Sequence, residues 1–173
     1  MKKLQEANLT NKEVKEKIGQ MIIVGFRGLE VSTSSDIVKA IGELNLGGVV
    51  LMDYDLPSKS YPRNIKDAQQ VKKLIQDLQS FSSTPLLVAV DAEGGLVNRL
   101  KPKYGFLEIP SPEQMGKGTP SATEKIAMSL AKQLSELGFN FNFAPVVDVN
   151  VNPKNPIIGE LGRSFSTNSV RVT

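Results

Sequence analysis

The stretch PLLVAVDAEGG, residues 85–95, decides the fold of this chain of 173 residues. It joins an apolar run, Leu86–Val90, to a carboxylate at Asp91 and then to two glycines. A short apolar run bounded by turn residues is typical of a parallel strand that is buried on both faces. A charged side chain directly after such a strand lies at the carboxyl edge of the sheet, where α/β proteins bind their ligands.

Three further apolar runs predict strands, at Met21–Phe26, Gly48–Met52 and Phe139–Pro145. Amphipathic stretches that predict helices separate them. Thr10 and Glu13 form a capping-box pattern that opens a helix over 11–20. Residues 34–44 and 64–81 repeat apolar residues at three- and four-residue steps, and Ser121 with Glu124 caps a helix that ends at Gly138. Strands that alternate with helices predict an α/β fold with a parallel sheet.

The connections that follow strands are long and polar, as in 91–120 and 146–163, whereas the returns from helix to strand are short. This asymmetry is typical of (β/α)8 barrels, which need about 250 residues for eight units. We therefore expect about four βα units, the N-terminal half of a (β/α)8 TIM-type barrel, forming one partial domain over residues 1–173. A Rossmann fold is not favoured, because residues 25–28 lack the Gly-x-Gly-x-x-Gly spacing.

The composition excludes several classes of protein. Hydrophobic residues make up 40% and charged residues 23% of the chain, as in globular proteins. The chain has no cysteine and no histidine, so thiolate and imidazole chemistry are absent from it. The net charge of +3 is spread over the expected helices, which predicts no nucleic-acid surface.

No apolar run is long enough to cross a bilayer, and the basic N-terminus, MKKLQEANLTNKEVKEK, lacks the apolar segment of a signal peptide. We therefore expect a cytoplasmic protein without a membrane partner. A mature exported chain whose leader had been removed would have the same sequence.

The first stretch that carries chemistry runs from Asp91 to Arg99. Gly94 and Gly95 permit tight turns and close approach of a ligand, and Arg99 could fold back as a bidentate donor. Carboxylate and guanidinium groups together suit sugar hydroxyls, each of which donates and accepts a hydrogen bond. The alternatives are that Asp91 caps a helix or forms a structural salt bridge with Arg99.

The second stretch, residues 140–166, gathers polar side chains past the fourth expected strand and contains Asp148 and Arg163. Arg163 is a candidate ligand residue, whereas Asp148 and the asparagines are as readily explained as turn formers. Glu93 is interpreted as a carboxylate that braces a loop. Asp53 and Asp55 are interpreted as ordinary loop residues.

These two stretches also carry a resemblance to a known family, which extends from about Lys17 to Ser166. The opening KIGQMIIVGF (17–26) is similar to the start of glycoside hydrolase family 3. DAEGGLVNR (91–99) resembles the pattern of its bacterial β-N-acetylglucosaminidase branch, and FAPVVD (143–148) with IGELGRSF (158–165) follows at the expected distance. The ordered set is far more specific than any one motif.

The resemblance implies that Asp91, Arg99 and Arg163 bind the terminal N-acetylglucosamine of cell-wall muropeptides or chitin-like oligosaccharides. It implies retaining hydrolysis by an aspartate nucleophile with a His–Asp acid/base pair, and no metal or organic cofactor. Those catalytic groups and a Lys-His sugar-binding pair belong to a later part of the family's barrel, so no residue here is assigned as catalytic and the isolated chain is expected to be inactive.

Three functions remain open from the sequence. The chain is part of a β-N-acetylhexosaminidase, or it is a non-catalytic sugar-binding half-barrel or one chain of a split enzyme, or it is another (β/α) enzyme that uses Asp91 with a cofactor. Four strands leave open sheet edges, so self-association or pairing with a complementary C-terminal half is a further expectation.

Overall fold

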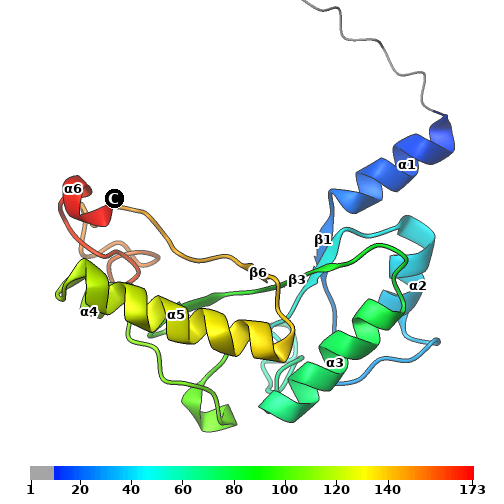
Figure 1. Ribbon diagram of the computed structural model, residues 1–173, viewed down its shortest axis with the longest axis horizontal. Coiled ribbons are helices and arrows are strands. Elements are labelled where there is room, and N and C mark those ends of the chain that lie inside the picture. Colours follow the sequence, from blue (N-terminus) through cyan, green and yellow to red (C-terminus); the bar gives the residue numbers. More distant parts are fainter. Residues whose placement is uncertain (1–9) are drawn as a thin grey trace, which may run out of the picture.

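The computed structural model describes residues 10–173 and shows a four-stranded parallel sheet with helices packed on one side (Figure 1). The expectation about a leader concerns in part residues 1–9, which lie outside the described residues. The sheet order is β1 (Ile23–Gly25), β2 (Gly48–Val50), β3 (Leu87–Val90) and β6 (Phe141–Asn142). Strand order thus follows chain order, as expected for successive βα units that turn in one direction.

One helix precedes the first strand, and one long helix lies between each pair of successive strands of the sheet. They are α1 (Asn11–Gln20), α2 (Asp36–Leu44), α3 (Ala68–Ser80) and α5 (Pro120–Leu137). The expected helix over 11–20 is confirmed with its capping box: Glu13 N–H donates to Thr10 Oγ1, and the Glu13 carboxylate accepts from the backbone N–H of Thr10. The expected stop at Gly138 is also confirmed, since this residue has φ +97° and closes α5.

Two helix starts were predicted wrongly. Helix α3 begins at Ala68 rather than near residue 64, because Asp67 caps it by accepting a hydrogen bond from Gln70 N–H. Ile65 is fully buried but lies before the helix. Its position matches the three- and four-residue spacing of the apolar residues in α3, which is why the sequence predicted an earlier start. At α5 the cap is Thr119, which accepts from Ala122 N–H ahead of Pro120 in the first turn, and not Ser121.

The stretch 91–120 contains more regular structure than its composition predicted. It forms an antiparallel hairpin of β4 (Ala92–Gly94) and β5 (Val97–Asn98), a 3-10 turn η1 (Pro102–Tyr104) and the short helix α4 (Pro112–Gly116). The fourth strand is shorter than expected, two residues instead of seven, and a last short helix α6 (Ser169–Val172) ends the chain. No helix among residues 10–173 is long and apolar enough to cross a membrane.

The two faces of the sheet differ in cover. In-register residues Val49 and Val88 are fully buried beneath the helices, in a core that includes Leu74, Leu78 and Leu134. On the opposite face Leu87 is 39% exposed and Phe141 38%, so the expectation that β3 is buried on both faces is wrong for this face. We call it the inner face, because in a closed barrel it would line the interior.

The inner face alternates large and small residues as barrel interiors do. In the row Ile23, Gly48 and Leu87 the side chains come from β1 and β3, and in the next row, Gly25, Val50, Ala89 and Phe141, the large ones come from β2 and β6. Layers filled from alternate strands are a property of (β/α)8 barrels. The fold is therefore the expected α/β arrangement of about four βα units from a barrel of this type.

A substitution at Gly138 tests its role in ending α5, and a substitution at Gly42 is the control. Gly138→Ala should lower the free energy of unfolding by about 1–3 kcal/mol, because alanine is strained in the left-handed region. The added Cβ would also lie 2.9 Å from a methyl of Ile75. The control, Gly42→Ala inside α2, meets nothing within 4 Å and should raise stability by about 0.5–1 kcal/mol. Urea denaturation measures both, and equal effects would contradict this account.

Candidate sugar-binding site

The site begins where β2 and β3 end. Because these strands are parallel and in register, Asp53 and Asp91 emerge at the same edge of the sheet, three and two residues past the ladder pair Val50–Ala89. The hairpin β4–β5 folds over this edge and returns the chain toward Asp91: Arg99 N–H donates to the Asp91 carbonyl at 2.9 Å. The backbone alone therefore brings Arg99 to Asp91.

The side chains of Asp91 and Arg99 form an ion pair. Arg99 donates from Nη2 at 2.9 Å and from Nε at 3.2 Å, both to Oδ2 of Asp91. Among residues 10–173 no hydrogen bond reaches Oδ1, and the Asp91 side chain is 21% exposed. One carboxylate oxygen and several guanidinium N–H groups thus remain available to a ligand. The geometry also satisfies the structural alternative, a salt bridge that fixes the hairpin.

Asp53 is part of the same network, which sequence reasoning missed. It was interpreted as an ordinary loop residue, but it is completely buried and forms an ion pair with Lys101, while Nη1 of Arg99 lies 3.9 Å from its Oδ1. Neither oxygen of Asp53 has a hydrogen-bond partner of good geometry among the described residues. Arg99 therefore lies between two carboxylates. The one available signal was that Asp53, like Asp91, follows an apolar strand.

The pairing with Asp53 changes the pKa of Lys101. Burial disfavours its charged form, but the close ion pair with Asp53 and the charge of that carboxylate outweigh burial, so the pKa of Lys101 is raised. Tyr61 contributes a contact of 3.4 Å through its hydroxyl. The loop that contains Tyr61 is thereby connected to the segment that carries Arg99.

Asp55 also differs from the expectation of an ordinary loop residue. It is buried, and Arg27 donates to it at 2.8 Å. The hydrogen bond from the Ser58 hydroxyl is the largest cause that lowers the pKa of Asp55. These contacts close the turn 55–60, so Asp55 shapes the loop beside the site.

Glu93 and Arg163 form a second pair, which joins the two stretches singled out in the sequence. Arg163 donates from Nη2 to Oε1 at 2.7 Å and from Nε to Oε2 at 2.9 Å, the bidentate geometry that suits a carboxylate. The side chain of Glu93 is 3% exposed and that of Arg163 20%. Glu93 thus braces the turn that presents Arg163, as interpreted from the sequence.

Electrostatics connects this second pair with the first. The hydrogen bond that Arg163 donates to Glu93 is the largest cause that raises the pKa of Arg163, and the charges of Asp91 and Asp148 raise it further. The structure therefore brings Asp91, Arg99 and Arg163 to one edge of the sheet. The Asp148 side chain is exposed, and its backbone carbonyl accepts from Ser164.

The asparagines of the second stretch act inside the sheet. Asn140 accepts from Val88 N–H at 2.7 Å and donates to the Leu86 carbonyl at 2.8 Å. Asn142 does the same for both backbone groups of Ala92, each at 3.1 Å. Since Ala92 lies between Asp91 and Glu93, Asn142 fixes the backbone from which both carboxylates project.

The glycines of the first stretch serve the chain's own packing. A Cβ at Gly94, which has φ +106°, would lie 2.1 Å from the Pro110 carbonyl oxygen, and a Cβ at Gly95 would lie 2.6 Å from Ser111 Cβ. The close approach expected for a ligand is thus made by residues 110–111. Both glycines are required by the segment that packs on the hairpin.

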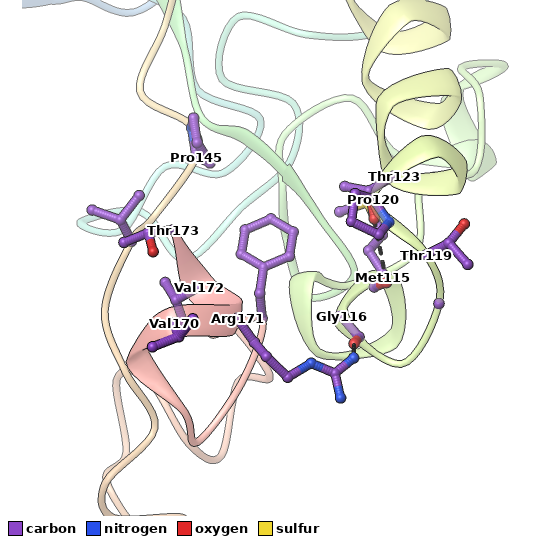
Figure 2. Close-up of a pocket in the computed structure, with 13 residues that line it drawn as sticks. Met115, Gly116, Thr119, Pro120, Thr123, Pro145, Val170, Arg171, Val172 and Thr173 are labelled. Carbon is purple, nitrogen blue, oxygen red and sulfur yellow. Dashed lines mark hydrogen bonds between the residues drawn. The ribbon is translucent and has the colours of Figure 1, made fainter.

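A separate cavity of about 470 Å³ lies between the start of α5 and the C-terminal residues (Figure 2). Val170, Val172 and Pro145 line it, and Arg171 crosses its rim to donate to the Gly116 carbonyl at 3.0 Å. None of Asp91, Arg99 or Arg163 lines this cavity. Within residues 10–173 no three His, Cys, Asp or Glu side chains are grouped to hold a metal ion.

Comparison with known proteins agrees with this fold. Residues 13–173 match the glycosyl hydrolase family 3 N-terminal domain. Beta-hexosaminidase A of Pseudoalteromonas piscicida is 36% identical over 150 residues, which cover 80% of this chain and 23% of that protein. Beta-hexosaminidase LpqI of Mycobacterium tuberculosis is 29% identical over 92% of this chain and 37% of that protein.

Solved structures give the same result. A family 3 beta-N-acetylglucosaminidase from Paenibacillus sp. FPU-7 superposes with a TM-score of 0.81 at 36% identity, covering 95% of this chain and 29% of that one. NagZ from Neisseria gonorrhoeae, in complex with N-trifluoroacetyl-D-glucosamine, gives 0.72 at 25% identity, covering 87% and 43%.

The fold is that of a glycosidase domain of the barrel type. The chain belongs to glycoside hydrolase family 3, and its relatives are β-N-acetylhexosaminidases. It spans between about a quarter and a half of the length of the relatives it matches.

The Asp53–Lys101 pair gives a testable prediction. In Asp53→Asn the pKa of Lys101 should fall, because burial still disfavours the ammonium while the counter-charge that raised the pKa is gone. The 13Cε shift of Lys101 followed by NMR against pH measures this. Lys73, whose pKa is raised by Asp77 on α3, is the internal control and should titrate as before. An unchanged Lys101 would contradict the assigned pairing.

Proposed function

We propose that this chain binds the terminal, non-reducing N-acetylglucosamine of a β-linked oligosaccharide for a family 3 β-N-acetylhexosaminidase. Asp91, Arg99 and Arg163 are the proposed sugar-binding residues. The observation that carries the proposal is the meeting of two arginine–carboxylate pairs, Asp91–Arg99 and Glu93–Arg163, at the carboxyl edge of one sheet. The relatives' names support the choice of sugar.

The chemistry of the pairs suits a pyranose ring. The open Oδ1 of Asp91 can accept from one hydroxyl while a free N–H of Arg99 donates to its neighbour, so two adjacent hydroxyls are bound in a fixed geometry. Because Arg99 is held by Asp91 and Asp53 before any sugar arrives, little side-chain entropy is lost on binding. Arg163, held by Glu93, offers its remaining N–H groups to a further polar group of the same sugar.

The hydrolytic step requires groups that this chain does not contain. A retaining mechanism with a His–Asp acid/base pair needs an imidazole, and the chain has no histidine. The nucleophile and the acid/base pair would therefore belong to the remainder of the parent enzyme. The isolated 173 residues should not hydrolyse p-nitrophenyl N-acetylglucosaminide. Hydrolysis by the purified chain that is lost in Asp91→Asn would come from the chain itself and would contradict this assignment.

The binding role is tested with N-acetylglucosamine itself. Arg99→Lys keeps the charge but loses the planar fork, and Asp91→Asn keeps the size but loses the charge. Each should weaken binding about tenfold, the equivalent of one charge-assisted hydrogen bond of about 1.4 kcal/mol. NMR chemical-shift perturbation measures the affinities. The matched control is Asp77→Asn, which removes a carboxylate from an exposed ion pair with Lys73 on α3.

The second candidate is a sugar-binding half-barrel without any hydrolytic partner, favoured by the absence of histidine. One experiment distinguishes the two functions. Addition of a polypeptide that contains the C-terminal part of a family 3 barrel should generate hydrolytic activity with this chain if it belongs to an enzyme. A binding module would retain its affinity for the sugar and gain no activity.

A further inference from the structure

The loop that follows β2 is closed by its own hydrogen bonds beside the candidate site. Asp55 and Ser60 form an isolated antiparallel bridge within it. At its base, Arg63 N–H donates to the Asp53 carbonyl at 2.8 Å. Residues 53–63 thus form a hairpin-like loop that is paired both at its base and near its tip. Its side chains therefore keep a defined arrangement before any ligand binds.

Three tyrosines gather where this loop meets the segment that follows β5. The ring centroids of Tyr54 and Tyr61 lie 4.7 Å apart, and those of Tyr61 and Tyr104 lie 6.5 Å apart. Tyr61 is 47% exposed, so part of this aromatic surface faces solvent. An exposed aromatic ring is a flat apolar surface with a polar hydroxyl at one end. Such a surface suits a sugar ring, which presents C–H groups on its faces and hydroxyls at its rim.

Two lysines complete this surface, which we call the tyrosine–lysine cluster (Tyr54, Tyr61, Lys101, Lys103 and Tyr104). The Nζ atom of Lys103 lies 4.3 Å from the ring centroid of Tyr61 and 4.8 Å from that of Tyr104. The Nζ atom of Lys101 lies 5.1 Å from the Tyr61 centroid and 3.4 Å from the Tyr61 hydroxyl. Because aromatic faces attract ammonium groups, the rings hold both cations at one surface.

The two lysines differ in how their charge is compensated. Lys101 forms an ion pair with Asp53. Lys103 is exposed and forms no ion pair with any carboxylate of residues 10–173. One uncompensated ammonium group suits an anion of single charge, such as a carboxylate. A phosphate monoester, which carries nearly two negative charges at neutral pH, would remain partly uncompensated.

A buried carboxylate connects the cluster to the proposed sugar-binding pair. Lys101 contacts Oδ2 of Asp53, and Nη1 of Arg99 lies 3.9 Å from Oδ1 of the same residue. Arg99 in turn donates to Asp91 at 2.9 Å. Asp53 is completely buried, so the cluster and the Asp91–Arg99 pair are neighbours on the two sides of one fixed side chain. A group bound at the cluster is therefore close to a sugar bound at Asp91.

We propose that the tyrosine–lysine cluster binds the sugar to which the terminal N-acetylglucosamine is linked, and that this second sugar carries a carboxylate. This inference rests on the proposed function, in which the terminal sugar is bound by Asp91 and Arg99. Lys103 pairs with the carboxylate, and the exposed part of the Tyr61 ring packs against the sugar ring. The carboxylate has two possible sources, a uronic acid, which carries it on the ring, and N-acetylmuramic acid, which carries it on an ether substituent.

Disaccharides that differ only in their second sugar test the inference. N-acetylglucosamine linked to glucuronic acid or to N-acetylmuramic acid should bind about tenfold more tightly than N,N′-diacetylchitobiose at low salt, the effect of one charge-assisted hydrogen bond. A gain for only one of the two acidic disaccharides identifies the source of the carboxylate. Isothermal titration calorimetry measures the affinities, and the preference should shrink as the salt concentration rises.

Variants of Lys103 assign the preference to the cluster. Lys103→Gln should bind acidic and neutral disaccharides equally, whereas Lys103→Arg should retain the preference because it keeps the charge. The matched control is Lys132→Gln, which removes the same charge from an exposed position on α5 and should retain the preference in full. Lys103 is exposed, so these substitutions should leave the fold intact, and circular dichroism checks this.

The two sugars added singly separate this inference from the proposed function. In NMR spectra, N-acetylglucosamine should shift the resonances of Asp91 and Arg99, and the acidic sugar those of Lys103 and Tyr61. Absence of the first shifts would overturn the proposed function and, with it, the assignment of a second sugar. Absence of only the second shifts, equal affinity for acidic and neutral disaccharides, or a preference that survives Lys103→Gln would overturn the inference and leave the proposed function intact.

Discussion

The parallel ladder in which β3 lies between β2 and β6 is the constraint on which the site depends. Its register aligns Val49 with Val88 and Ala89 with Phe141, so the chain leaves β2, β3 and β6 at the same edge. Asp53, Asp91 and the segment that leads to Asp148 are thereby brought together without any direct sequence relation. A shift of one residue would turn Val88 and Val90 toward the inner face and carry Asp91 to the opposite side. Asn140 and Asn142 secure this register at its weakest point, the two-residue strand β6. Asn140 bonds to the backbone of Leu86 and Val88 at the start of β3, and Asn142 bonds to Ala92 just past its end.

Ion pairs then orient the charged side chains that the parallel ladder brings to this edge of the sheet. Asp53 and Glu93 are almost completely buried, whereas their cationic partners keep a fifth to a third of their side chains exposed. Desolvation of the carboxylates costs free energy that the pairing does no more than offset, so these contacts are a weak source of stability. Their consequence is orientation. Arg99 lies between Asp91 and Asp53, and Arg163 is held on two oxygens of Glu93, so both guanidinium groups keep a defined direction at an open edge.

Much of the fold could be predicted because it depends on short-range signals. The strand at 86–90, the capping box at Thr10 and the αL stop at Gly138 are each determined by neighbouring residues. The start of α3 could not be located, since a buried Ile65 outside the helix has the same spacing as one inside it. Asp91, Arg99 and Arg163 were singled out by residue type and position, and the structure brings them to one edge of the sheet. Asp53 was missed because its burial depends on Lys101, which follows it by 48 positions and reaches it only through the β4–β5 hairpin.

The inner face and the site are built on the same strands, but they depend on different contacts. The inner face consists of side chains such as Leu87 and Phe141, which become well packed only when other strands complete their layers. The arginine–carboxylate pairs are complete within this chain, because both partners of each pair come from residues 53–163. The edge that would contact a sugar is therefore organised by local contacts, and the interior beneath it by contacts with further strands. Further strands that closed a barrel on this sheet would exclude water from Asp91, Arg99 and Arg163, and their ion pairs would become stronger in the lower dielectric without having to rearrange.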